Sequence, residues 1–567
     1  MPKSASGCLR ELEIQLTTFG EVASGRKLAW LRSLAVAVLP SADAVLRLHE
    51  ALCFLRAYPD DRALLQQVEA VLATFDHRAD LRRFRRQLQD SGVAGTDIQY
   101  EFYLKMAQQL ARRWPERLTL DWSEYKTEEQ QLKLEKILHL LALYSETPGL
   151  DEFAYPVREW IERMKRPDET DAAFLVRRIT ALPLDNFSLE FFYEDLGLPM
   201  RLAPGPDTPS RSRAKAPGRP VVFQNGPLRR GRPDLAVEID RPPLAIHDVP
   251  PREGRRFIEL ACEAMVTRSR DLDVFANGDP RDVRIVDCGD GLEFVAIGAT
   301  PERRLMFEAV YGFLALKNGV PVGYVLNSAL FGSVEVAYNI FDTFRGGEAA
   351  DMYGRVLAAL KALFGVDAFT IFPYQLGGEG NDEALQSGAW WFYQKLGFRA
   401  RDPEVLRLMR QELARMRRNP RHRTSIATLA ELASVNVYYH HGRQRDDVIG
   451  LLPLGNLGLH ITRYLARGFG SARQQAGKQC GAEAAARLGL RSLRDLPPGE
   501  RLAWERWSPL LLLLPGLENW SPAEREGLRE VVLAKGGQRE SDFAVRFDAH
   551  RKLRTALLRL IRREVGP

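Results

Sequence analysis

The sequence predicts an α+β protein in which a central mixed sheet with helices is flanked by N-terminal and C-terminal all-helical regions. Apolar residues recur at helical spacing from about residue 10 to 200 and again beyond 400, whereas 236–400 alternates apolar strands with glycine turns. A basic, proline-rich stretch separates the N-terminal segment with helical spacing from the segment with strands and glycine turns. We therefore expect a helical domain over 1–200, a linker over 201–235, a mixed α/β domain over 236–400 and a helical region over 401–567.

The composition excludes several classes of protein. The 567 residues are 45% hydrophobic and 27% charged, which is ordinary for a soluble globular chain. Five scattered cysteines form no CxxC pair, so we expect neither a disulfide framework nor a metal site, and a reducing cytoplasm as the location. No apolar signal core opens the sequence, and the run Leu510–Leu514 is too short to cross a membrane. The net charge of +6 is small, so nucleic acid is not the expected partner.

The first two segments carry no cluster of chemically active residues. Ser41 and the pair Thr127 and Gln130 are typical N-terminal caps of helices. Residues 201–233 hold seven prolines, eight Lys or Arg and one acid, a composition that predicts a linker with little buried surface. A solvated tether is the commoner interpretation of such a stretch, and a basic arm that contacts phosphates is the alternative.

The central segment contains two hairpin signals and a strand–turn–helix. Gly289-Asp290-Gly291 and Asn318-Gly319 each separate two apolar runs, which is a strong hairpin pattern. The run SVEVAYNIF then leads through FRGGEAA into the helix ADMYGRVLAALKALF, and AFTIFPY predicts a further strand.

Beyond residue 400, Asp402-Pro403 starts a helix and Asn419-Pro420 ends it. A basic cluster over 415–423, with His422, is open to two interpretations: phosphate contacts, or a solvated helix C-terminus, which is commoner. His440-His441 lacks the spacing of a metal-ligand set, and Leu510–Leu514 is expected to be a buried helix segment.

The hairpin ending in VPVGYVL, the strand–turn–helix, AFTIFPY and the closing FYQKLGF follow one another over about 250–400 as in the GNAT superfamily of N-acetyltransferases, which this segment resembles. A glycine turn before a helix exposes unpaired N–H groups beside the positive end of the helix dipole, an arrangement that binds phosphates. The resemblance implies that this turn holds the pyrophosphate of acetyl-CoA or another acyl-CoA. The aligned residues are Arg345, Gly346, Gly347, Ala349 and Ala350.

The resemblance also implies roles for three further residues. Asn381 would contact pantetheine, and Tyr393 would protonate the departing thiolate of CoA, because a phenol is neutral at working pH. Glu335 would remove the proton from an amine acceptor. The alternatives are a core position for Tyr393 within an aromatic helical stripe, and a solvent-facing position for Glu335. Glu348 departs from the family's pattern, which has glycine at that position.

Three functions remain open at this point. The first is an acyl-CoA-dependent N-acyltransferase whose unidentified amine acceptor attacks the thioester directly and is expected to be macromolecular or protein-bound. The second is a GNAT-fold module that has lost CoA binding and serves as an interaction scaffold, an alternative motivated by Glu348 and the long spacing from Asn381 to Tyr393. The third is a nucleic-acid-associated protein that uses the basic segments over 201–233 and 415–423.

Overall fold

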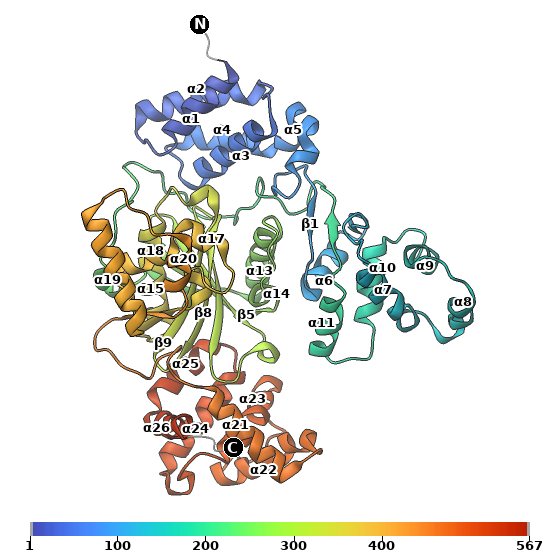
Figure 1. Ribbon diagram of the computed structural model, residues 1–567, viewed down its shortest axis with the longest axis vertical. Helices are drawn as coiled ribbons and strands as arrows, with labels where there is room; N and C mark the ends of the chain where they lie inside the picture. The colour runs from blue at the N-terminus through green and yellow to red at the C-terminus, as the bar shows by residue number, and fades with distance from the viewer. Residues whose placement is uncertain (1–3, 564–567) are drawn as a thin grey trace. The chain divides into compact units, whose positions relative to one another are not determined.

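A computed structural model describes residues 4–563 and divides into two compact units (Figure 1). The first unit comprises the residues up to Pro227 with Arg256–Asn277 and Lys317–Pro321. The second comprises Leu228–Arg255, Gly278–Leu316 and the residues from Val322 onward. The second unit thus contains most of the predicted mixed domain together with the predicted C-terminal helical region. It is an α+β structure.

The first unit is built mainly from helices. Ser41 caps α3, where its side chain accepts from Ala44 N at 3.2 Å, and Thr127 and Gln130 form the expected capping box on α7. The helices are α1 (Ala5–Gln15), α2 (Glu21–Val36), α3 (Ala42–Ala57), α4 (Arg62–Ala73), α5 (Ala79–Phe84), α6 (Leu104–Arg113), α7 (Glu128–Leu141), α8 (Thr147–Glu152), α9 (Val157–Met164), α10 (Asp171–Thr180) and α11 (Asn186–Asp195).

The prediction of an all-helical N-terminal region is wrong in one respect. Three short strands, β1 (Ile98–Tyr100), β2 (Leu118–Leu120) and β3 (Met200–Leu202), form an antiparallel sheet in the order β1-β3-β2. Each strand has only three residues, which is too short for alternation of apolar and polar residues to be recognised in the sequence.

The first half of the segment after β3 is packed, so the interpretation as a solvated tether is wrong for residues 208–216, whereas most of 217–233 is exposed or half-buried. Ser210 and Ser212 are 5% and 2% exposed. The buried guanidinium of Arg56 donates to the backbone oxygens of Ser212 at 2.7 Å and Arg211 at 2.8 Å. His49 Nε2 lies 2.8 Å from Ser212 Oγ. Polar side chains of α3 thus satisfy the backbone of a segment whose composition alone predicts little burial.

The second unit is organised around a nine-stranded sheet in the order β11-β12-β10-β9-β8-β7-β6-β5-β4. Strands β9 and β10 pair in parallel, whereas β4–β5, β5–β6, β8–β9, β10–β12 and β11–β12 pair antiparallel. The strands are β4 (Ala245–Asp248), β5 (Gly278–Gly289), β6 (Leu292–Ala299), β7 (Ala309–Lys317), β8 (Val320–Leu330), β9 (Ser333–Ile340), β10 (Ala368–Ile371), β11 (Arg399–Ala400) and β12 (Val437–His440).

The turns of this sheet follow the sequence closely. Asn318 and Gly319 have φ values of 50° and 76°, as a two-residue hairpin turn between β7 and β8 requires. The predicted boundary at residue 400 is wrong for the sheet, because β12 lies beyond it and inserts between β10 and β11. With four residues, β12 gives too short a pattern to be separated from the surrounding helices.

Helix α15 (Ala349–Phe364) connects β9 to β10 and packs closely on α12 (Leu235–Asp240). A Cβ at Gly354 would lie 3.0 Å from Glu238 Cβ, so the small residue permits this approach. The other helices of the second unit before residue 400 are α16 (Pro373–Leu376), α17 (Asp382–Ser387) and α18 (Ala389–Leu396). Helix α14 (Asp273–Ala276) and most of α13 (Pro251–Val266) belong to the first unit.

The C-terminal residues form a helical bundle. Helix α19 has the predicted start and end, and Leu510 and Leu511 at the end of α23 are buried as expected. The helices are α19 (Pro403–Arg418), α20 (Ile426–Leu432), α21 (Gly455–Phe469), α22 (Arg473–Leu488), α23 (Pro498–Leu511), α24 (Pro522–Gly536), α25 (Glu540–Ala549) and α26 (Arg551–Arg562).

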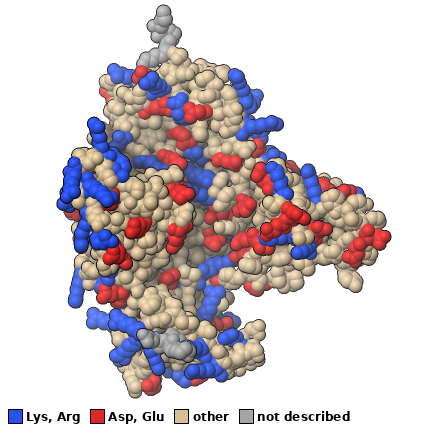
Figure 2. Space-filling view, in the orientation of Figure 1, with Lys and Arg blue, Asp and Glu red and all other residues tan. Residues whose placement is uncertain are grey.

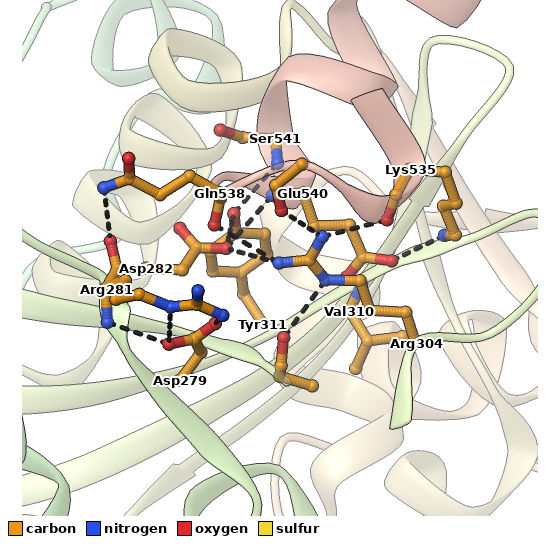
Figure 3. Close-up of polar contacts among 12 residues, drawn as sticks. Asp279, Arg281, Asp282, Arg304, Val310, Tyr311, Lys535, Gln538, Glu540 and Ser541 are labelled. Carbon is orange, nitrogen blue, oxygen red and sulfur yellow. Dashed lines mark hydrogen bonds and ion pairs between the residues drawn. The ribbon is translucent and has the colours of Figure 1, made fainter. Parts of the chain in front are cut away.

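A buried ionic cluster joins this bundle to the sheet (Figure 3). Lys535 Nζ at the end of α24 lies 2.5 Å from Glu540 Oε1 at the start of α25, and it also donates to Glu308 O at 2.7 Å. The Arg304 guanidinium donates to the backbone oxygens of Lys535 at 2.9 Å and Gly537 at 2.6 Å. These charges have several partners each, so the cluster fastens the bundle to the sheet.

Asp282 on β5 completes the ionic cluster. Its Oδ2 accepts from the Tyr311 hydroxyl at 2.7 Å and from Glu540 N at 3.0 Å, and it lies 3.8 Å from Arg304 (Figure 3). Burial raises the pKa of Asp282 in spite of these contacts. In the part of the chain that the structure describes, no helix is long and apolar enough to cross a membrane.

Candidate functional site

The predicted cofactor turn lies between β9 and α15, as the sequence indicates. A short 3₁₀ helix, Asp342–Phe344, follows β9, and Gly347 N donates to Phe344 O at 2.9 Å. A Cβ at Gly346 would have nothing within 4 Å, so space is open beside the turn there. Ala349 and Ala350 begin the helix, and first-turn N–H groups have no acceptor within their own helix.

The guanidinium of Arg345 is already engaged. It forms an ion pair with Asp342 at 2.9 Å, a second ion pair with Glu383 of α17, and a hydrogen bond to Ile340 O at 3.3 Å. The side chain is still 45% exposed. A diphosphate that used Arg345 would therefore compete with two carboxylates in a solvated position.

Glu348 lies at the N-terminus of α15, where the family pattern has glycine. The residue is 8% exposed, and its Oε1 accepts from Arg229 N at 3.1 Å. The Arg229 side chain lies 4.0 Å from Asp351 and 3.3 Å from Asp290. Burial, with Glu238 and Glu348 nearby, raises the pKa of Asp351. The chain thus supplies its own carboxylates at the positive end of this helix.

Strands β9 and β10 stop pairing halfway along β9. Their parallel register runs from Ser333 opposite Ala368 to Glu335 opposite Thr370. Strand β9 continues to Ile340 in antiparallel pairing with β8, while β10 ends at Ile371 and the chain turns into α16. Among residues 4–563, the β10-side edge of Val336–Ile340 has no strand partner. This edge offers backbone hydrogen-bonding groups to an extended ligand.

Glu335 lies at the point where the two strands stop pairing. Burial, and secondarily the nearby carboxylate of Glu308, raises its pKa to about 7. Ser328 is directly opposite on β8, and Thr370 is opposite on β10. Thr370 Oγ1 donates to Ile449 O at 2.9 Å. A carboxyl group with a pKa near neutrality exchanges protons readily at working pH, which is the requirement for a general base.

Two further polar atoms lie on the same face of the sheet as Glu335. Asn339 follows Glu335 by four residues on β9, so both side chains are on one face, and Ser328 shares that face from β8. Ser328 Oγ and Asn339 Oδ1 are buried, and neither has a hydrogen-bond partner among the described residues. Other described residues also have buried polar atoms without partners, Asp282 Oδ1 among them, so these two atoms support a ligand site only together with the unpaired edge beside them.

Tyr393 on α18 lies within an aromatic cluster. It is 3% exposed, and its ring centroid lies 5.6 Å from that of Tyr353 and 5.7 Å from that of Phe398. Burial raises the pKa of the Tyr393 hydroxyl, so the phenol keeps its proton. The aromatic stripe is therefore core, and the acid role of Tyr393 stays a prediction.

Asn381 has a local structural role. Its side-chain oxygen accepts from Ala384 N at 3.1 Å and so caps α17, and its amide nitrogen donates to Tyr374 O at 2.8 Å. A contact with pantetheine would need one of these hydrogen bonds to be exchanged.

Sequence reasoning missed four residues of this region: Arg229, Glu308, Ser328 and Asn339. Gly332 is the sequence signal that bears on Ser328, because a glycine between two apolar runs indicates a tight turn. The turn at Phe331 and Gly332, with φ values of 53° and 63°, sets the β8–β9 register. Nothing in the local pattern signals Glu308 or Arg229, which reach the site only through tertiary packing.

Comparison with known proteins adds no relative: no family model, no curated protein and no solved structure matches the chain. The described residues contain no group of three or more His, Cys, Asp or Glu side chains that could hold a metal ion.

Proposed function

We propose that the second unit is an acyl-CoA-dependent N-acyltransferase of GNAT type, in which an amine attacks the thioester directly. The proposal is supported by one observation above all: β9 and β10 stop pairing at Glu335, whose pKa is about 7. The unpaired edge of Val336–Ile340 would align an extended pantetheine arm. The acceptor is an amine, in keeping with the carboxyl group of Glu335 at the start of this edge and with the further negative charge of Glu308, which acts on Glu335.

The chain's own groups account for the proton movements. Glu335 takes a proton from the ammonium form of the acceptor, which frees the nitrogen lone pair. Acyl-CoA supplies the carbonyl carbon, to which the nitrogen bonds as the carbon–sulfur bond breaks. Tyr393 donates its phenolic proton to the sulfur. The second proton that the nitrogen loses as the amide forms returns the Tyr393 phenolate to the phenol, and the products are an amide and free CoA. Positioning of the two reactants supplies most of the rate enhancement.

The turn over 345–350 would hold the diphosphate of CoA. Open space at Gly346 and the first-turn amides of Ala349 and Ala350 favour binding. Arg345 would exchange Asp342 and Glu383 for phosphate oxygens, and Asn381 would lie close to the pantetheine arm. The buried carboxylate of Glu348 opposes binding, so we expect weak affinity for CoA, with a dissociation constant of about 0.1 mM.

Calorimetry and thermal unfolding with acetyl-CoA test the proposal. A ligand at ten times its dissociation constant adds about 1.4 kcal/mol of apparent stability. Glu335→Gln should retain this shift and lose acyl transfer to small amines and lysine peptides, while Arg345→Glu should lose the shift. Glu526→Gln, an exposed acid on α24, is the matched control for both readouts. Absence of any shift at millimolar acetyl-CoA would reject the proposal.

A module that has lost CoA binding and acts as an interaction scaffold is the second candidate. It is favoured by the carboxylate of Glu348 at the N-terminus of α15 and by the engaged guanidinium of Arg345. Glu348→Gly separates the candidates. If the wild-type protein binds no CoA and the variant does, the carboxylate has disabled the site, and the scaffold is correct.

A further inference from the structure

The surface around α19 carries a local excess of positive charge that the overall net charge of +6 conceals. Residues 395–423 contain nine Arg and one Lys against three acids. Figure 2 shows Lys and Arg side chains gathered along the edge where Figure 1 places α19. The arginines of this group that lie on α19 and on the loop after it are exposed.

The three acids of this segment are all engaged. Asp402 caps α19, where it accepts from Glu404 N at 2.9 Å and Val405 N at 3.0 Å. Glu404 pairs with Arg407 at 2.5 Å. Glu412 is 1% exposed and binds Arg415 at 2.6 Å and His422 at 2.7 Å.

Seven basic side chains of the segment are left without a carboxylate partner among the described residues. Arg401 is not one of them, because it pairs with Asp446. We call these seven the α19 basic strip: Lys395, Arg399, Arg410, Arg417, Arg418, Arg421 and Arg423. The helix dipole accounts for Arg417 and Arg418 in the last turn of α19, but the dipole effect is confined to that turn. It therefore does not explain the other five.

One end of the strip lines a cavity. Lys395 and Arg399 face a hollow of about 350 Å³, together with Arg232 and the ring of Tyr439. The acid in the lining, Asp234, accepts from Ala236 N at 3.0 Å as the cap of α12. Three cations and an aromatic ring around one polar cavity suit a phosphate with an attached planar base.

We propose that the α19 basic strip and this cavity bind a nucleic acid through its phosphate backbone, with one nucleotide seated beside Tyr439. Arg predominates, and a planar guanidinium binds phosphate oxygens in bidentate fashion. The sixteen residues of α19 extend about 24 Å, which matches roughly seven phosphates of one strand. Among the described residues, none of the strongly exposed large apolar side chains lies within 395–423, so the strip lacks groups that enter a bilayer. The inference does not rest on the acyltransferase proposal.

Fluorescence anisotropy of the full chain with labelled 20-nucleotide single strands and 20-base-pair duplexes, over a series of salt concentrations, tests this inference. The test variant replaces Arg410, Arg417, Arg418 and Arg421 by Ala, which preserves helix propensity on α19. The control replaces four exposed cations elsewhere in the second unit by Ala: Arg473, Lys478, Arg491 and Arg494. Both variants lose the same charge, and circular dichroism checks that both fold.

We expect the test variant to bind roughly a hundredfold more weakly at low salt and to reduce the slope of log affinity against log salt by about 3 to 4 on the duplex. The control should keep the wild-type slope within about one unit. Tyr439→Leu should weaken single-strand binding severalfold and leave the duplex slope unchanged. The inference is overturned if neither nucleic acid binds, if the control loses as much as the test variant, or if phosphatidylserine vesicles bind equally well and lose binding in the same variant.

Discussion

The second unit contains two groups of acidic side chains with different surroundings. In the ionic cluster of Figure 3, Glu540 and Asp282 are fully buried and meet Lys535, Tyr311 and backbone N–H groups at hydrogen-bonding distance. In the β9 region, Glu335 is less deeply buried, and the charge that raises its pKa further is another carboxylate, that of Glu308. Burial raises acid pKa values in both places, but only in the first do opposite charges offset the cost.

This difference distinguishes buried charges that stabilise the fold from buried charges that are available to a ligand. A network whose buried acids meet cations and backbone N–H groups holds elements together and changes little when ligands bind, although one of its atoms, Asp282 Oδ1, has no partner among the described residues. Glu335 is harder to ionise in the folded protein, and Ser328 Oγ and Asn339 Oδ1 on the same face have no hydrogen-bond partners among the described residues. A cationic ligand bound here would favour the ionised carboxylate and so stabilise the folded state. The three predictions below test whether this distinction holds.

The largest effect is expected from Lys535→Met. It leaves Glu540 buried without its cation, and we expect a loss of about 3 to 5 kcal/mol in the free energy of unfolding. The pKa of Glu540 should rise further, so the loss should be larger at pH 8 than at pH 5. Urea unfolding at both pH values measures it.

Two further variants test whether the loss of stability in Lys535→Met comes from the pair of Lys535 and Glu540. Lys552→Met, on an exposed lysine of α26, should change stability by less than about 0.5 kcal/mol. Lys535→Met combined with Glu540→Gln should lose less than the sum of the single variants, since the double change removes both charges. Strict additivity would show that the two residues are not coupled in the folded protein.

Glu335→Gln should have a smaller effect of opposite sign. The folded-state pKa of about 7 lies above the unfolded value of 4.5, so the folded wild-type protein binds the extra proton between these values and loses stability as the pH rises through them. Glutamine does not ionise, and the variant should therefore be more stable by about 1 to 3 kcal/mol at pH 8, with little difference at pH 4.

The pH dependence of unfolding provides the measurement. The difference between wild type and Glu335→Gln should grow from pH 4.5 to 7 and stay constant above pH 7. A difference that is independent of pH would mean that Glu335 ionises normally, and the comparison with the ionic cluster would fail.

The contrast between the two groups also explains what the sequence predicts and what it does not. Local patterns located the turn after β9 and the start of α15, because both depend on neighbouring residues. The ionic cluster joins residues more than 200 positions apart, such as Asp282 and Glu540, and no local pattern contains that information. For the same reason the segment after β3 was expected to be solvated: its burial depends on His49 and Arg56 of α3.

For the candidate site, too, the sequence predicts where residues lie along the chain but not what surrounds them. Glu335 was identified from its place before the turn, and its strand position is as expected. Its raised pKa comes from burial and Glu308, which belong to the tertiary structure. Asn381 was chosen by motif position, and Glu348 was noted as a departure from the motif, but their hydrogen bonds to Tyr374 and Arg229 depend on tertiary structure.

The smallest effect distinguishes two serines at the β8–β9 hairpin. Ser333 Oγ donates to Leu330 O at 2.7 Å and accepts from Ile449 N at 2.9 Å, whereas Ser328 Oγ is buried and has no partner among the described residues. Ser333→Ala leaves a buried N–H unsatisfied and should cost about 1 to 3 kcal/mol. Ser328→Ala removes a hydroxyl that has no hydrogen bond to lose, and should change stability by less than about 0.5 kcal/mol or increase it. Equal losses in urea unfolding would mean that Ser328 is satisfied in the free protein, and the polar face beside Glu335 would then be a structural feature like the ionic cluster.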